Sequence, residues 1–192
     1  RPVVEEVHGT IVECNTAYGD ATAGVRDHTE SHSRLIKEHG WTKYFDVDLM
    51  DAEGPDVVWP IPNGKILKEN HLGKNIMHYD SMLVLAHFKG HPMGGYGGAL
   101  KQLSIGCASR AGKALIHSAG KTDDRFATWQ QHASAVEFPE AMADAASSVA
   151  EHFRGQLACI NVMKNLSVDC DCCPGAEDPC MADIGMLASL DP

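Results

Sequence analysis

The chain has 192 residues, of which 44% are hydrophobic and 22% charged, and this composition is typical of a globular protein with one hydrophobic core. Its formal net charge of −10 would repel a nucleic-acid backbone or an anionic membrane surface, so neither partner is expected. No apolar run approaches the roughly 20 residues needed to cross a bilayer. No signal peptide is recognisable either, and together these features predict a cytoplasmic protein.

The first predicted elements are short. Residues 9–13 (GTIVE) form a β-branched run that predicts a strand. A helix is expected over residues 25–38, closed by Gly40 as its C-terminal cap. Two further short strands are expected at residues 44–47 and 57–59.

The second half of the chain carries the strongest patterns. Residues 82–86 (MLVLA) and 157–163 (LACINVM) are apolar throughout, which is typical of strands covered on both faces. Helices are expected over residues 99–110, ended by Gly112, and over residues 138–153.

Strands that alternate with helices predict an α/β fold, with a mainly parallel sheet that has helices on both faces. No internal repeat or long linker divides the sequence, so residues 1–192 are expected to form a single domain.

Seven cysteines are distributed unevenly, since four of them fall between Cys170 and Cys180. An odd, clustered set is a poor disulfide framework for a chain of this length. The pattern favours a reducing compartment and thiols that bind a metal or take part in redox chemistry. The other three, Cys14, Cys107 and Cys159, lie at or within apolar or helical segments and are expected to pack in the core.

Unusual polar residues follow three of the predicted strands, at residues 15–18, 87–98 and 169–180. Ligands of open α/β sheets bind beyond the carboxyl ends of the strands. This convergence predicts a functional site where these three segments meet.

His87 and His91 are four residues apart, but Gly90 and Pro92 argue against a helix there. The pair is expected on a loop that folds back, where imidazoles serve as metal ligands or substrate contacts. The alternative is that one histidine caps the strand and the other is a surface residue.

A glycine-rich segment precedes the helix expected at residue 99. Backbone N–H groups at such a helix start can hold an anion, and Lys101 lies one turn inside. The alternative is a tight turn with close packing. The glycines concerned are Gly94, Gly95, Gly97 and Gly98.

Cys170 and Cys172 offer two thiolates on one face of an extended segment. Together with His87 and His91 they predict a transition-metal site, with zinc or iron favoured over magnesium or calcium. The neighbouring carboxylates that would support these ligands are Asp169 and Asp183. Two alternatives stay open: an exposed thiol cluster, and a redox disulfide between Cys173 and Cys180.

Three further residues have weaker claims to this site. Arg26 and His32 flank a helix start and face either the same cleft or solvent. His117 follows a short apolar run and is a secondary candidate.

Several of these motifs together resemble the domain of unknown function 362 family over nearly the whole chain. The resemblance rests on residues 15–19, Arg26, His32, residues 39–40, 85–91, 94–101, 112–117, 166–172 and 183–192.

Many members of that family carry a ferredoxin-type insert with iron–sulfur clusters. This chain has no cysteine between His117 and Phe138 and no ferredoxin spacing elsewhere, so no ferredoxin-type cluster is expected. The resemblance also implies that the natural protein begins before Arg1 and continues past Pro192.

These observations favour a metal-dependent protein that acts on a small anionic molecule. The expected catalytic residues are His87, Lys89, His91 and Lys101, and the expected ligand contacts are the four glycines with Asn15 and Tyr18. The first alternative is a metal or redox-centre binding module without turnover. The second is a partner domain without a cofactor, whose polar cluster is structural.

Overall fold

The structure is a computed structural model that describes residues 9–18, 25–170 and 178–192. Its strands are β1 (Ile11–Glu13), β2 (Val47–Leu49), β3 (Val57–Pro60), β4 (Glu69–Leu72), β5 (Met82–His87), β6 (Lys89–His91), β7 (Gly95–Gly97), β8 (Leu157–Met163) and β9 (Gly185–Ser189). Its α-helices are α2 (Thr29–Glu38), α3 (Ala99–Lys101), α4 (Arg110–His117) and α5 (Glu137–His152).

Short helical turns of other types connect these elements. Three are 3-10 helices, η1 (Trp41–Lys43), η2 (Lys74–His78) and η4 (Thr128–Gln130), and η3 (Gln102–Gly106) is a π-helix that continues α3. In the part of the chain that is described, no helix is both long and apolar enough to span a membrane.

The described strands form small sheets, so the prediction of a mainly parallel sheet with helices on both faces is wrong. β5 pairs with β8 in parallel, but β9 joins β8 antiparallel to complete a sheet of three strands. β1 and β2 form a parallel pair, whereas β3–β4 and β6–β7 are antiparallel pairs. The alternation of strands and helices was read as repeated parallel crossovers, but much of the chain forms local two-stranded pairs instead.

The apolar strand β5 is also not covered on both faces. Val84 and Ala86 of β5 are each 3% exposed, and they face the core. Leu83 and Leu85 on the opposite face are 38% and 53% exposed. An unbroken apolar run therefore predicted β5 correctly, but it predicted a second covering layer that the described residues do not supply.

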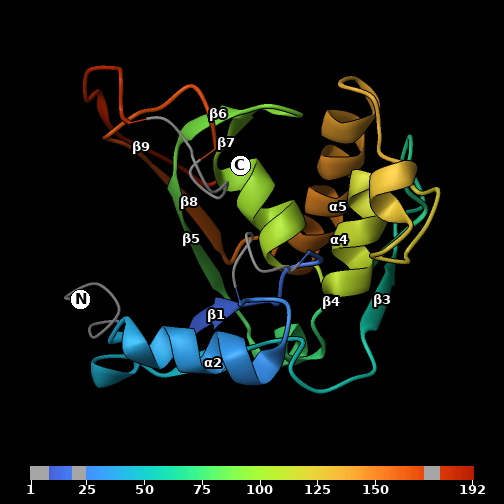
Figure 1. Cartoon of the computed structure of the whole chain (residues 1–192), viewed down its shortest axis with the longest axis horizontal. Helices are drawn as coiled ribbons and strands as arrows, with labels where there is room; N and C mark the ends of the chain where they lie inside the picture. The colour runs from blue at the N-terminus through green and yellow to red at the C-terminus, as the bar shows by residue number, and fades with distance from the viewer. Residues whose placement is uncertain (1–8, 19–24, 171–177) are drawn as a thin grey trace.

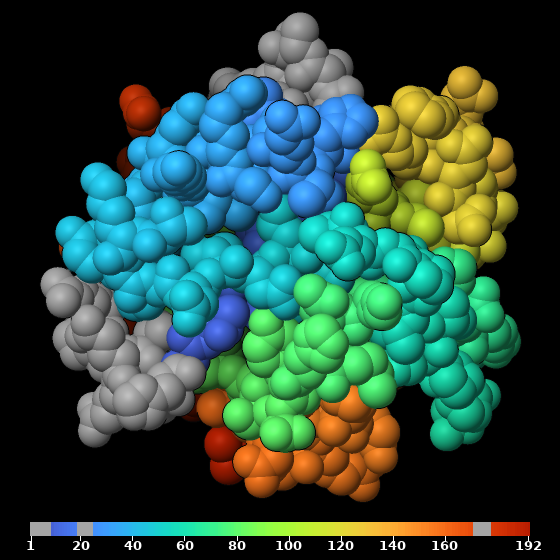
Figure 2. Space-filling view, turned by 90° about the horizontal axis from the view of Figure 1, so that it is seen from below, coloured from blue at the N-terminus to red at the C-terminus, as the bar shows by residue number. Residues whose placement is uncertain are grey.

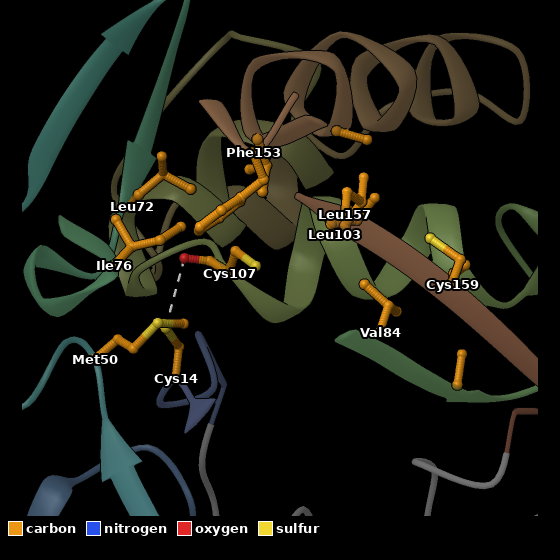
Figure 3. Close-up of a cluster of buried hydrophobic side chains, with 14 residues drawn as sticks. Cys14, Met50, Leu72, Ile76, Val84, Leu103, Cys107, Phe153, Leu157 and Cys159 are labelled. Atoms are coloured by element: carbon orange, nitrogen blue, oxygen red, sulfur yellow. Dashed lines mark hydrogen bonds between the residues drawn. The ribbon is translucent and has the colours of Figure 1, made fainter. Parts of the chain in front are cut away.

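The covered face of this sheet packs on the helix formed by α3 and η3, which in turn contacts α5 (Figure 1). Leu103 of η3 is fully buried between them. The same hydrophobic cluster reaches the N-terminal strands through Cys14 and Met50, and the Cys14 thiol donates to the carbonyl oxygen of Cys107 at 3.5 Å (Figure 3). One core thus connects segments that are distant in the sequence.

Element positions are predicted best where the pattern is long. The helix predicted at residues 138–153 is α5, and the strand predicted at residues 157–163 is β8. The helix predicted at residues 25–38 begins only at Thr29, and Gly40 follows it in the left-handed conformation with φ of +80°.

The predicted helix over residues 99–110 is interrupted. η3 ends at Gly106, and Ser109 caps a new helix, α4, by accepting a hydrogen bond from the Gly112 N–H. Gly112 therefore lies inside a helix, although the sequence suggested that it ended one. A Cβ at this position would lie 2.0 Å from the carbonyl oxygen of His71, so glycine is needed for close contact between α4 and β4.

Phe138 anchors a second hydrophobic cluster, between α4, α5 and the β6–β7 hairpin. Its ring is fully buried and lies 4.9 Å from the ring of His117 and 5.8 Å from that of His91, measured between centroids.

We expect Phe138→Ala to lower the free energy of unfolding by about 3–5 kcal/mol, because it leaves a cavity in this cluster. The matched control is Phe126→Ala, since Phe126 is 74% exposed and should cost less than about 1 kcal/mol. Urea unfolding of both variants measures the difference. Equal losses would show that Phe138 does not anchor the cluster.

Candidate functional site

A cavity of about 630 Å³ lies between the N-terminal segment and the ends of the central strands. Its walls come from the segment around β1, from α2, from the end of β5, from the β6–β7 hairpin and from α3–η3. α2 and the segment that follows it form a large part of the surface seen from below (Figure 2, blue and cyan). A volume of this size is typical of sites for small molecules.

The lining of this cavity is basic, although the whole chain carries a net charge of −10. Four of the 16 lysines and arginines line it, and among the described residues Glu13 is the only lining carboxylate out of 26 acidic residues in the chain. Three histidines, His32, His39 and His87, also contribute to the lining. The four basic residues are Arg26, Lys89, Lys101 and Lys113.

Lys89 is held in place by an unusually close backbone contact. The next residue, Gly90, donates its N–H to the carbonyl oxygen of Ser167 at 2.8 Å. A Cβ on Gly90 would lie 1.5 Å from the carbonyl oxygen of Val168, so only glycine allows β6 to approach the segment after β8. This approach brings the third predicted strand end beside the second.

Lys101 lines the cavity and also contacts Cys170, which lies in the segment after β8. It lies at the end of α3, and its Nζ is 3.6 Å from the Sγ of Cys170, which is 1% exposed. The Cys170 thiol is thus buried against an ammonium group.

His87 and His91 have different surroundings. His87 lines the cavity, and its Nε2 donates to the carbonyl oxygen of Lys164 at 2.7 Å. His91 packs on Phe138 instead, and its Nδ1 accepts the N–H groups of Met93 and Gly94 at 3.2 and 3.0 Å.

Two buried histidines, His32 and His117, and the half-buried His91 are held in the neutral form. Burial lowers the pKa of His32, His91 and His117 to about 4, and nearby positive charges add to the effect. Arg26 is the main such charge for His32, whereas Lys101 acts on both His91 and His117.

The predicted ligand contacts after β1 divide into two roles. Tyr18 lines the cavity, and its ring packs edge-on against Trp129 with 5.8 Å between centroids. Asn15 is fully buried behind the lining, where its side chain contacts Thr29, Asp51 and His32.

The glycine-rich segment also divides. Gly97 and Gly98 line the cavity, whereas the Gly94 N–H is used by His91 and Gly95 has a left-handed φ of +77° in the hairpin. The Ala99 N–H at the start of α3 donates to the Asn161 side chain at 2.9 Å. Lys101, rather than these amides, is therefore the group through which this segment can attract an anion.

The two carboxylates expected at the metal site lie on the surface. Asp169 and Asp183 are both exposed, and the Asp183 carboxylate accepts the N–H of Asn165 at 2.8 Å. Cys172 and Cys173 lie outside the described residues. No group of three or more His, Cys, Asp or Glu side chains able to hold a metal occurs within residues 9–18, 25–170 and 178–192.

The sequence patterns gave little indication of two residues that line the cavity. Lys113 was noted only within the family motif, yet it is 6% exposed and its Nζ donates to the carbonyl oxygen of Ala108 at 2.6 Å. His32 was left between cleft and solvent, and it is 3% exposed in the wall of the cavity. A lysine or a histidine on the apolar face of a helix is the sequence signal that could have identified them.

The sequence model of a family described as "Domain of unknown function (DUF362)" matches residues 1–192. Neither the curated proteins nor the solved structures include a match to the chain.

His32, His91 and His117 should make the stability of the fold depend on pH. Because their pKa values in the folded state are about 4, against 6.5 in the unfolded chain, the unfolded state binds more protons between these values. Their contribution is present above pH 6.5 and is lost as the pH falls towards 4.

The free energy of unfolding should decrease as the pH falls from 6.5 to 4. We expect His117→Gln to make this decrease smaller, by up to about 1.4 kcal/mol per pH unit. His28→Gln is the control, since the His28 side chain is 67% exposed. Urea unfolding across the interval between pH 6.5 and 4 measures both slopes. A slope unchanged by His117→Gln would contradict a neutral, buried His117.

The metal site stays a prediction, because Cys172 is not described. If the thiols are ligands, protein purified without nickel should contain zinc or iron, and Cys170→Ser combined with Cys172→Ser should abolish it. Elemental analysis measures the metal content of each protein. Cys107→Ser is the control, because this cysteine lies in the core and should not affect metal content. Equal metal content in the parent and the double variant would rule out the thiols as ligands.

Proposed function

The chain belongs to the DUF362 family along its whole length, and we propose that its cavity binds a small molecule through a phosphate or carboxylate group. The observation that carries the proposal is the concentration of positive charge. Arg26, Lys89, Lys101 and Lys113 converge on a cavity of about 630 Å³ in a protein whose net charge is −10.

Like charges that converge in a partly buried space repel one another, since the local dielectric is lower than in water. Within the part of the chain that the structure describes, Glu13 is the only carboxylate that lines the cavity. An anionic ligand relieves this repulsion and accepts charge-assisted hydrogen bonds from the same groups. The arrangement therefore favours a ligand with a net negative charge.

The size of the cavity limits the ligand to a small molecule. Leu35, Ile36 and Ile105 give one part of the lining an apolar character. A ligand with a charged head and a short carbon skeleton suits both parts of this lining.

Inorganic phosphate and pyrophosphate are suitable probes, because they carry the proposed charge without assuming a carbon skeleton. We expect both to shift backbone NMR signals of the residues around the cavity. Affinity should fall as salt is added, because ions screen the attraction.

Lys101→Gln should weaken binding of pyrophosphate about tenfold or more, since hydrogen bonds to charged groups contribute about 1.5–3 kcal/mol. Lys121→Gln is the matched control, because Lys121 is an exposed lysine outside the lining, 3.6 Å from Glu137. Calorimetric titration measures both. Equal affinity in the two variants, or no binding by the parent, would overturn the proposal.

A further inference from the structure

Buried residues outside the cavity lining hold the ring of His32 in its orientation. Its Nδ1 lies 3.2 Å from the Asn15 Oδ1. The three residues connected by this series of hydrogen bonds are all buried: His32, Asn15 and Asp51. The Asn15 side-chain nitrogen donates to the Asp51 carboxylate at 3.0 Å and to the Thr29 hydroxyl at 3.0 Å.

These contacts determine which ring nitrogen of His32 carries the proton. A carboxylate only accepts hydrogen bonds, so the Asn15 amide must turn its NH₂ group to Asp51 and its oxygen to His32. The oxygen of an amide is likewise only an acceptor. The His32 Nδ1 must therefore be the donor, and in the neutral ring its Nε2 is left with a lone pair.

The surroundings keep this ring neutral. The charged groups that act on it are Arg26, Asp51 and Lys113, and burial with the Arg26 charge outweighs the opposite effect of Asp51 and lowers its pKa to about 4. At neutral pH the His32 Nε2 is thus an acceptor among cations. Within the described residues it has no hydrogen-bond partner.

We propose that His32 selects the ligand of the cavity by accepting a hydrogen bond at Nε2, so that the preferred ligand is an anion that also carries an O–H or N–H donor. This inference rests on the proposed anion site. The cations attract the charge, whereas His32 distinguishes anions that can donate from those that cannot. Asn15 and Asp51 are positioning residues, because they act through the ring of His32.

A pair of inorganic anions tests the selection. Hydrogen phosphate and sulfate have similar size and, at mildly alkaline pH, the same charge, but only hydrogen phosphate has a donor. An acceptor left unpaired in a buried site is costly, so phosphate should bind at least about tenfold more tightly than sulfate.

His32→Phe should bring this ratio close to one while the cations still bind both anions. His28→Gln is the control, because His28 is exposed and should leave the ratio unchanged. Sulfate that binds the parent as tightly as phosphate would overturn the inference and leave the anion site standing. Failure of both anions to bind would remove the anion site and the inference with it.

A second measurement needs no anion. Long-range proton–nitrogen NMR on the parent protein should show the His32 Nδ1 protonated and Nε2 unprotonated at neutral pH. Asn15→Leu should abolish this fixed tautomer, since it removes the accepting oxygen. A proton on Nε2 in the parent would overturn the inference whatever the anions do.

Discussion

The hydrogen bonds that one oxygen of the buried Asp51 carboxylate accepts organise the N-terminal part of the structure. The Asp51 Oδ1 accepts both the backbone N–H and the side-chain NH₂ of Asn15, at 2.8 and 3.0 Å. The parallel pairing of β1 with β2 brings these two residues together, since each follows the end of its strand. Through Asn15 the same contact reaches α2 at Thr29 and His32, so one carboxylate links two strands and a helix.

The cavity exists because this N-terminal unit faces the ends of the central strands. Cys14 and Met50 attach the unit to the main hydrophobic core, and the polar residues beside them remain at its edge. On the opposite wall, β6 and α3 present Lys89 and Lys101. Two walls from distant parts of the sequence thus place cations around an oriented, neutral imidazole. The family to which the chain belongs has no assigned activity in its description, so this chemistry is the most specific statement that the geometry supports.

The candidate site was predictable in part, for a simple geometric reason. β5 and β8 are parallel neighbours, so their carboxyl ends lie at one edge, and the residues that follow them were expected to meet. Gly90, which follows β5, donates its N–H to the carbonyl oxygen of Ser167, which follows β8. His87 and His91 come to lie in different surroundings, because the chain turns between them from β5 into a separate hairpin and His91 packs on Phe138.

Local patterns in the sequence by themselves determined β5, β8 and α5, because a long apolar run or a 3.6-residue period is a property of one segment. They also determined the excess of negative charge. Only the tertiary structure decided how the strands pair, why Gly112 lies inside a helix, and where four basic residues converge. Each of these depends on contacts between segments far apart in the chain, and such contacts leave no periodic signal in either segment. His32 shows the difference most clearly, since its place on α2 follows from local sequence, whereas its tautomer depends on a carboxylate 19 residues away.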